Sequence, residues 1–463
     1  MTLIKSISGI RGTIGGKANE NLTPIDIVKY AAAFGEWLKK NAENAENLKI
    51  VIGRDARISG QMLSQLVAAT LQGLGFEVVD LGLATTPTVE IAVPLEKANG
   101  GIILTASHNP IQWNALKLLN AKGEFISAQD GQELLEIAEK EDFTFAEVKK
   151  IGSYTFNDTY LQKHIEMILA LPLVDVEAIR SRNFKIAVDA VNSVGGFAVP
   201  ALLRALGVSQ IGEFNCEVTG IFAHNPEPLP EHLLQFSRDV SKGAYDLGIV
   251  VDPDVDRLAF IRENGEAFGE EYTLVAVADY VLKHQQGSTV SNLSSTQALK
   301  VITEKNGQSY FASAVGEVNV VAAMKNAKAV IGGEGNGGII YPNLHYGRDA
   351  LVGIALFLTH LAKFGKSITL LRATYPNYYI SKNKIELDEG INVDEVLEKM
   401  QQKYSKFQTN TIDGLKVIFD NAWVHLRKSN TEPIIRIYAE ADSISTADNL
   451  AEKVMKDIRE LSK

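Results

Sequence analysis

The amino-acid sequence predicts an α/β protein that ends in a smaller α+β domain. Short apolar runs, typical of buried strands, alternate with helix-like segments over most of the chain. Near the carboxyl terminus this alternation stops, and strand-like runs follow one another directly. The length of 463 residues indicates several cores, because a single domain ordinarily holds roughly 100–200 residues. We therefore expect three or four domains.

The first helix is expected to begin at Pro24. Thr23 can cap this helix, and proline suits a first helical turn, where no intrahelical backbone N–H bond is required. Apolar residues then recur at helical spacing and form one face for the core. These residues are Ile27, Tyr30, Ala31, Phe34 and Leu38.

Five short apolar runs each lead directly into a polar loop. The runs are 49–53, 101–104, 185–188, 247–251 and 329–332, and their loops begin at Arg54, Thr105, Asp189, Asp252 and Gly333. Open α/β sheets bind ligands at the carboxyl ends of their strands. These loops are therefore the expected sites of function, and their recurrence suggests a repeated α/β unit.

The C-terminal segment has a different pattern. The runs 417–419 and 422–426 read as neighbouring strands joined by a turn at Asp420-Asn421, and 434–438 reads as a further strand. A final helix places apolar side chains on one face. They are Ala447, Leu450, Ala451, Val454, Ile458 and Leu461.

Composition excludes several classes of partner. The net charge of -10 argues against nucleic acid, because phosphate backbones require a broad basic surface. No apolar stretch approaches the roughly 20 residues that a membrane span needs. Cys216 is the single cysteine, so no internal disulfide can form. We expect a cytoplasmic protein, and the sequence makes no prediction of its oligomeric state.

Thr105-Ala106-Ser107-His108-Asn109-Pro110 places a serine on a tight turn at a strand end. Proline after Asn109 favours an extended or turn backbone there. A lone turn serine usually satisfies its own backbone. A serine hydrolase would show the Gly-x-Ser-x-Gly string, which does not surround Ser107.

Asp252, Asp254 and Asp256 alternate along a loop that follows an apolar run. Alternate residues of an extended segment point to one side, so the three carboxylates repel one another unless a hard cation binds them. Mg²⁺ suits carboxylates combined with a phosphate oxygen, and we expect one ion per chain. The alternatives are a solvated acidic turn and a phosphoaspartate phosphatase site.

Two further loops carry polar side chains suited to a sugar phosphate. Glu334 and Asn336 lie among glycines that let backbone approach a ligand closely, and their side chains can bond hydroxyl groups. In the segment 427–433, an arginine able to fork onto a phosphate is followed by short donors. The donors are Arg427, Ser429, Asn430 and Thr431. The plain alternatives are a surface loop and a polar hairpin turn.

This ordered set of motifs resembles the α-D-phosphohexomutase family, which comprises phosphoglucomutases, phosphomannomutases and phosphoglucosamine mutases. The resemblance runs from Ser8-Gly9-Ile10-Arg11-Gly12 to the Arg427 loop, and shorter matches lie between them. These are Gly53-Arg54-Asp55-Ala56-Arg57, Thr86-Pro87-Thr88, His224-Asn225-Pro226-Glu227-Pro228 and Ser294-Ser295. The resemblance implies three similar α/β domains with mixed sheets and a C-terminal α+β domain around a central cleft. We expect domains at 1–152, 153–256, 257–372 and 373–463.

The resemblance also implies roles for individual residues. Ser107 would carry the phosphoryl group and join the three aspartates in holding Mg²⁺. Arg11 and Lys117 would lie near the transferring phosphate. His108 would either orient the phosphoserine or shape the turn. The substrate-binding residues would be Arg257, Glu334, Asn336, Arg427, Ser429, Asn430 and Thr431.

Three positions depart from the family pattern. Pro253 replaces a glycine of the metal loop, Asn336 replaces a serine, and Gly338 stands where the family has a histidine. Lys117 therefore becomes the first candidate for the general acid or base, and base duty requires a depressed pKa. Weaker candidates are Glu317, His345 and Arg348. The glycine-rich loop and His345-Tyr346-Gly347-Arg348-Asp349 look most like archaeal-type phosphoglucosamine mutases.

The sequence thus predicts a phosphohexomutase that works through phosphoserine and a bisphosphorylated sugar, with a hexose bisphosphate as primer. Glucosamine phosphate is the favoured substrate. The alternatives are a phosphoglucomutase or phosphomannomutase of broader specificity and a non-catalytic sugar-phosphate sensor. The expected partner is a small hexose phosphate, with neither nucleic acid nor membrane involved.

Overall fold

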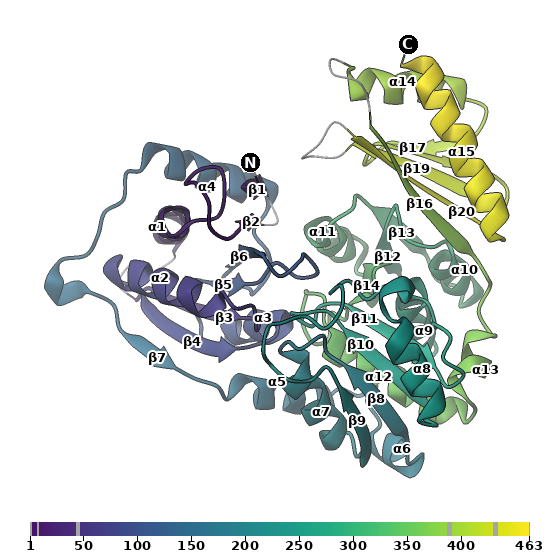
Figure 1. Cartoon of the computed structure of the whole chain (residues 1–463), viewed down its shortest axis with the longest axis horizontal. Coiled ribbons are helices and arrows are strands. Elements are labelled where there is room, and N and C mark those ends of the chain that lie inside the picture. Colours follow the sequence, from purple (N-terminus) through teal and green to yellow (C-terminus); the bar gives the residue numbers. More distant parts are fainter. Residues whose placement is uncertain (1, 7–8, 43–46, 387–390, 429–433, 463) are drawn as a thin grey trace. The chain divides into compact units, whose positions relative to one another are not determined.

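The computed structural model describes residues 2–6, 9–42, 47–386, 391–428 and 434–462 (Figure 1). The chain forms two compact units, one of residues 1–273 and 337–371 and the other of residues 274–336 and 372–463. The predicted α/β class with a C-terminal α+β region is confirmed, because three mixed or parallel sheets precede an antiparallel one.

The first unit begins with a seven-stranded mixed sheet in the order β1-β2-β6-β5-β3-β4-β7. Its strands are β1 (Ile4–Ser6), β2 (Gly9–Thr13), β3 (Lys49–Arg54), β4 (Glu77–Leu83), β5 (Gly100–Leu104), β6 (Trp113–Asn120) and β7 (Tyr154–Phe156). Its helices are α1 (Pro24–Asn41), α2 (Gly60–Gly73), α3 (Thr86–Leu95) and α4 (Ala128–Lys140). The predicted helix at Pro24 is confirmed, and Thr23 caps it through a capping box with Asp26.

Alternation along the buried strands supplies two cores to this sheet. Ile50, Ile52 and Ile102 pack with α1, α2 and α4 on one face. Val51 and Ile103 point to the opposite face, where α3 packs. Because helices cover both faces, the strands read as continuous apolar runs, as the sequence suggested.

The first unit contains a second sheet in the order β11-β10-β8-β9. Its strands are β8 (Lys185–Asp189), β9 (Gln210–Phe214), β10 (Leu247–Val251) and β11 (Leu258–Arg262). The helices nearby in sequence are α5 (Tyr160–Leu169), α6 (Val176–Ser181), α7 (Gly195–Ala205) and α8 (Leu234–Lys242). The unit also includes β15 (Gly338–Ile340), α12 (Ala350–Phe364) and most of α13 (Ile368–Arg372).

The second unit contains parallel strands in the order β13-β12-β14 and then the C-terminal sheet β16-β20-β19-β18-β17. The first group comprises α9 (Glu270–Leu282), which begins in the first unit, β12 (Thr289–Asn292), α10 (Ala298–Lys305), β13 (Tyr310–Ser313), α11 (Glu317–Ala327) and β14 (Ile331–Glu334). The C-terminal group comprises β16 (Tyr379–Glu386), α14 (Val393–Lys403), β17 (Gln408–Asn410), β18 (Leu415–Ile418), β19 (Trp423–Lys428), β20 (Ile434–Ala441) and α15 (Ile444–Leu461).

The C-terminal sheet is antiparallel throughout, and α14 and α15 pack on it (Figure 1). The predicted face of the last helix is confirmed at Ala447, Ala451, Val454 and Ile458, which are buried. One predicted strand is shifted: the run 329–332 begins later, as β14, and extends to Glu334. The sequence suggested that the glycines at 332 and 333 end the strand. They do not, because both residues pair with the parallel strand β12.

Candidate active site

The serine loop and the acidic loop meet at the carboxyl ends of two buried strands. Ser107 follows β5 and Asp252 follows β10, and both side chains are buried. Ser107 Oγ donates a hydrogen bond of 2.7 Å to Asp252 Oδ2. The two loops come from different sheets, so the fold of the first unit brings them together over 145 residues of sequence.

The backbone of the serine turn is held in an unusual conformation. Ser107 has φ 49, in the left-handed region that non-glycine residues rarely adopt. Its N–H donates to Thr105 Oγ1 (2.9 Å), and Thr105 Oγ1 donates to Asp55 Oδ2 (2.7 Å). Strain of this kind persists only where surrounding contacts fix it, and it concentrates at functional sites.

Arg57 is the main support of the serine turn. Its side chain is fully buried, and the guanidinium donates to the carbonyl oxygens of four residues that surround the turn. The distances are 2.6 Å to Ser107, 2.7 Å to Asn109, 2.8 Å to Pro110 and 2.9 Å to Trp113. Arg57 Nε also donates to Asp55 Oδ2 at 3.1 Å. The Gly53–Arg57 string was identified from the sequence only as a match to the family, and no role was predicted for Arg57.

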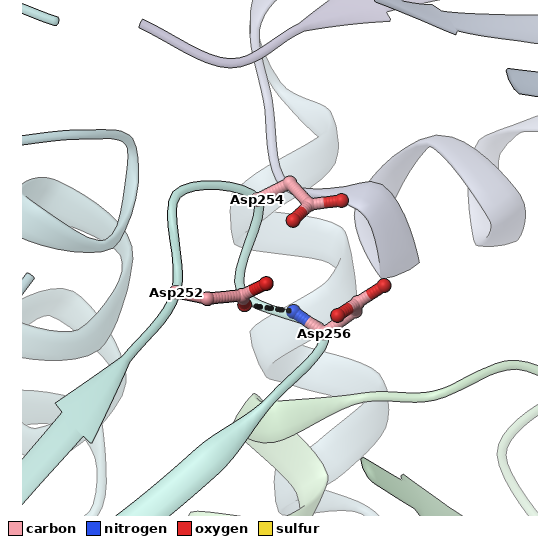
Figure 2. A group of neighbouring side chains, drawn as sticks. All are labelled: Asp252, Asp254 and Asp256. Carbon is pink, nitrogen blue, oxygen red and sulfur yellow. Dashed lines mark hydrogen bonds between the residues drawn. The ribbon is translucent and has the colours of Figure 1, made fainter. Parts of the chain in front are cut away.

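The three aspartates form one carboxylate cluster on the loop between β10 and β11 (Figure 2). One oxygen from each of Asp252, Asp254 and Asp256 lies within 4.8 Å of the others. Asp252 Oδ1 accepts from the backbone N–H of Asp256 (3.1 Å) and of Arg257 (3.0 Å), which fixes the loop. Val255, between two of the carboxylates, has φ 63, a strained value for a β-branched residue.

Cationic and hydroxyl groups hold one side of this cluster. Lys117 Nζ donates to Asp254 Oδ2 (2.7 Å) and Asp256 Oδ2 (3.3 Å). Arg348 Nη2 donates to Asp256 Oδ2 (2.7 Å), and Thr86 Oγ1 donates to Asp254 Oδ2 (2.6 Å). These contacts of Arg348 and Thr86 were not predicted from the sequence. Each residue nevertheless lies in a sequence string that resembles the family.

The other side of the cluster fits a metal ion. Asp254 Oδ1 and Asp256 Oδ1 are buried and have no hydrogen-bond partner among the residues that the structure describes. Burial and the two neighbouring carboxylates raise the pKa of Asp252 well above its ordinary value. Buried carboxylate oxygens that lack partners and repel one another are what a hard divalent cation stabilises. The donor set therefore fits Mg²⁺.

The charge states of Lys117 and His108 follow from their surroundings. Burial lowers the pKa of Lys117, but Asp254 and Asp256 outweigh it, so the net shift is upward. The surroundings of Lys117 therefore do not supply the depressed pKa that base duty requires. His108 Nδ1 lies 3.3 Å from Ser107 Oγ. Burial, with Arg257 and Arg11 nearby, lowers the pKa of His108 well below 6.5, so its imidazole is neutral.

The remaining predicted residues of the first unit lie around these loops. Arg11 Nη1 donates to Asn109 Oδ1 of the serine turn at 2.7 Å. Arg257 pairs with Glu227 at 3.1 Å. His345 Nε2 lies 3.3 Å from Asp349, so this weaker acid/base candidate contacts the cap of α12 instead of the carboxylate cluster.

The predicted sugar and phosphate residues belong to the second unit. Glu334 is buried, and its Oε1 accepts from Asn292 Nδ2 (2.9 Å) and from the N–H of Gly316 (3.1 Å). Asn336 is half-buried in the turn after β14. Arg427 lies on β19, with Nη1 3.7 Å from Asp413 Oδ2. Ser429, Asn430 and Thr431 lie outside the described residues. Glu317 begins α11.

Four family profiles match the chain in order. They describe the phosphoglucomutase/phosphomannomutase alpha/beta/alpha domain I (residues 3–145), domain II (162–265), domain III (269–378) and the C-terminal domain (384–457). No helix among the described residues combines the length and apolar character that crossing a bilayer requires.

Curated relatives match over nearly their whole length. A phosphoglucomutase/phosphomannomutase of Thermococcus kodakarensis is 37% identical over 458 residues, covering 98% of this chain and 99% of the relative. A phosphoglucosamine/phosphogalactosamine mutase of Sulfurisphaera tokodaii is 33% identical over 455 residues, covering 97% of each.

Solved structures share the fold. A phosphoglucomutase/phosphomannomutase family protein from Burkholderia thailandensis superposes with a TM-score of 0.85 at 24% identity, covering 99% of this chain and 98% of that one. Aspergillus fumigatus N-acetylphosphoglucosamine mutase in complex with GlcNAc-6P and magnesium has a TM-score of 0.61 at 16% identity, covering 100% and 96%.

Proposed function

The chain belongs to the phosphoglucomutase/phosphomannomutase family of phosphomutases, and we propose that it interconverts the 6- and 1-phosphates of glucosamine. As a phosphohexomutase it is an isomerase that moves a phosphoryl group within one hexose. The observation that carries the proposed mechanism is the 2.7 Å contact between Ser107 Oγ and Asp252, inside a buried three-carboxylate cluster. A serine in that position is suited to carry the transferred group.

In the first step, phosphorylated Ser107 donates its phosphoryl group to a free hydroxyl of the hexose phosphate. The bond between phosphorus and Ser107 Oγ breaks, a bond to the sugar oxygen forms, and the hydroxyl proton ends on Oγ. His108 is placed to relay that proton, because its Nδ1 lies 3.3 Å from Oγ. The product is a bisphosphorylated sugar, which turns round and returns its other phosphate to Ser107. The same bisphosphate, supplied from outside, primes an unphosphorylated enzyme.

The charges around the serine suit this transfer. Mg²⁺ held by Asp252, Asp254, Asp256 and the serine would neutralise charge on the phosphoryl oxygens, which is the main source of catalysis in phosphoryl transfer. Lys117, kept protonated by two of these carboxylates, serves as a fixed cation and not as a base.

The second unit supplies the recognition residues in this proposal. Glu334 is held by Asn292 and Gly316 so that its carboxylate is fixed before a sugar arrives, and Asn336 follows it. Both would bond sugar hydroxyls in either orientation. Arg427, with Ser429, Asn430 and Thr431, would hold the phosphate that is not reacting.

Two observations bear on the substrate. The glycine-rich loop 333–338 and the string 345–349 look most like those of archaeal-type phosphoglucosamine mutases, and the relative from Sulfurisphaera tokodaii is named for phosphoglucosamine and phosphogalactosamine, which favours an amino sugar. The relative from Thermococcus kodakarensis is named for phosphoglucomutase and phosphomannomutase activity. A phosphoglucomutase or phosphomannomutase of broader specificity is therefore the second candidate.

A comparison of three substrates tests this proposal. Purified enzyme is assayed with glucosamine 6-phosphate, glucose 1-phosphate and mannose 1-phosphate, each with Mg²⁺ and a trace of the matching bisphosphate. We expect the highest kcat/KM with glucosamine 6-phosphate and no turnover by Ser107→Ala. A preference for glucose or mannose phosphate would reject the substrate assignment, and inactivity with all three would favour a sugar-phosphate sensor.

A further inference from the structure

Arg257 follows the acidic loop directly and presents one edge of its guanidinium for a ligand. The side chain is 9% exposed, and Nη1 donates to Glu227 Oε1 at 3.1 Å. Nε is buried and has no hydrogen-bond partner within the part of the chain that the structure describes. Because a guanidinium has five donors in a fixed fork, a carboxylate at Nη1 leaves the edge formed by Nε and Nη2 for a phosphate. Glu227 therefore holds Arg257 without occupying that edge.

The backbone of Glu227 is fixed on both sides. Its N–H donates to Asn225 Oδ1 (3.0 Å), and its carbonyl oxygen accepts from the N–H of Leu229 (2.8 Å) and lies 2.9 Å from His232 Nδ1. Buried prolines precede and follow it, at 226 and 228. Proline fixes its own φ and restricts the residue before it. The backbone conformation at Glu227 is therefore tightly restricted.

The segment that contains Glu227, residues 219–228, is called the strap here. Its other end is tied to the last residue of β8 and to the loop that follows this strand. His224 Nε2 lies 3.1 Å from Asp189 Oδ1, the N–H of Gly220 donates to the carbonyl of Asn192 (3.0 Å), and Asn192 Nδ2 donates to the carbonyl of Ile221 (3.0 Å). Asn192 has φ 55, in the left-handed region.

The strap also contacts the scaffold of the serine turn. The Phe222 ring lies under the Arg57 guanidinium, 4.9 Å from its centroid to Cζ. Gly220 has φ 70, and a Cβ there would lie 1.9 Å from the carbonyl oxygen of Ala56. Glycine is required for this approach. The strap thus runs from the arginine that holds the serine loop to the arginine that ends the acidic loop.

We propose that Glu227 is a positioning residue that aims Arg257 at a phosphate group of the hexose phosphate, with the strap anchored by the pair His224–Asp189. The inference rests on the proposed mutase function and assigns the segment His224-Asn225-Pro226-Glu227-Pro228 its part in substrate recognition. A pre-ordered arginine binds phosphate more tightly because less side-chain freedom is lost on binding.

The charge of His224 supports this anchor. Nδ1 lies 2.8 Å from the carbonyl oxygen of Asn225, which can only accept, and Nε2 faces the carboxylate of Asp189. Both ring nitrogens therefore act as donors, which requires the imidazolium form. Burial lowers the pKa of His224, but Asp189, the charged group that faces it from β8, and the Asn225 carbonyl outweigh this effect and raise it.

Steady-state kinetics of Glu227→Ala test the proposal, with Glu227→Gln as the conservative variant. Glu231→Ala is the matched control, because Glu231 is an exposed glutamate in the short 3-10 helix Pro230–His232 that follows the strap. We expect Glu227→Ala to raise KM for the hexose phosphate roughly 3–10-fold, the cost of ordering one long side chain, with kcat changed by less than about twofold. Glu227→Gln should be intermediate and Glu231→Ala unchanged. Thermal unfolding of each variant reports any loss of folding.

A pH series separates positioning from general stability. The ratio of KM for His224→Ala to KM for wild type should be above one at about pH 6 and approach one as pH rises through the raised pKa, because the wild-type imidazolium is then lost. An unchanged or lowered KM in Glu227→Ala would overturn the inference, as would a KM ratio that is constant with pH. If the wild-type enzyme turns over none of the hexose phosphates, the proposed function falls and this inference with it; if wild type is active and Glu227→Ala matches it, only the inference falls.

Discussion

Replacing Arg57 by methionine should destabilise the first unit and release the serine turn. Arg57 makes its ion pair with Asp55 where both side chains are 0% exposed. Removing one partner of a buried pair costs about 3–5 kcal/mol, because the other charge is left uncompensated. The carbonyl of Ser107, one of the four that Arg57 bonds, lies in a buried contact, and leaving it without a donor adds about 1–3 kcal/mol.

The sum of about 4–8 kcal/mol approaches the whole stability of an ordinary domain, about 5–15 kcal/mol. Burial already raises the pKa of Asp55, even with Arg57 beside it, so this carboxyl should take up a proton in the variant. The double variant Asp55→Asn with Arg57→Met removes both charges. This variant should recover most of the unfolding free energy that is lost with the broken ion pair. Its serine turn should still lack the hydrogen bonds that Arg57 donates.

Urea unfolding and hydrogen exchange of the peptide around Ser107 measure the two effects separately. We expect Arg57→Met to lose several kcal/mol of unfolding free energy, and the double variant to be folded, with fast exchange in the serine turn and little mutase activity. If the unfolding free energy of Arg57→Met lies within about 1 kcal/mol of the wild-type value and the variant keeps its activity, then Arg57 does not support the serine turn.

Three further predictions concern the metal, the sugar and pH. Mg²⁺ should raise the melting temperature of the wild type, and Asp256→Asn should abolish this rise and lower kcat about 100-fold or more, since metal stabilisation of the transferring group is worth several kcal/mol. No rise in the wild type, or a thermal shift and rate retained by the variant, would contradict the metal assignment. Glu334→Gln should lower kcat/KM roughly 10–100-fold, the worth of hydrogen bonds to a charged group, and an unchanged value in steady-state kinetics would remove it from the sugar site. Burial lowers the pKa of His425 to about 4, so the folded state holds a neutral imidazole. Below pH 6.5 the unfolded state takes up a proton that the folded state does not bind, and the unfolding free energy therefore falls as the pH is lowered towards 4. The unfolding free energy of wild type relative to His425→Gln should fall by about 3 kcal/mol over that range, and a constant difference would refute the shift.

The sequence was sufficient for the elements that follow local rules. The helix at Pro24 formed where a cap and a first-turn proline coincide, and β5 and β10 formed where apolar runs end in polar loops. The meeting of Ser107 with the aspartates was predicted only through the family resemblance, because nothing local links residues 145 positions apart. The end of β14 was misplaced because the glycines at 332 and 333 suggested a break, whereas both pair with β12 and the strand extends to Glu334.

The supports of the site were beyond local reasoning. Thr86, Arg348 and Glu227 each form a hydrogen bond with a residue of the 252–257 segment. The sequence around each of them does not indicate which residue it contacts. The sign of the Lys117 pKa shift was also inaccessible, since it depends on whether burial or two nearby carboxylates dominates. These contacts and this pKa shift depend on distances between segments that lie far apart in the sequence, and sequence spacing does not encode those distances.

Phosphoryl transfer onto Ser107 can be followed directly and tests whether this serine is the phosphocarrier. Enzyme freed of phosphate is incubated with Mg²⁺ and a hexose bisphosphate labelled in its phosphates, then digested, and the labelled peptide is identified by mass spectrometry. We expect label on Ser107, loss of that label on addition of unlabelled hexose phosphate, and no labelling of Ser107→Ala. Label on another residue, or mutase turnover without labelling of Ser107, would contradict this role of the serine.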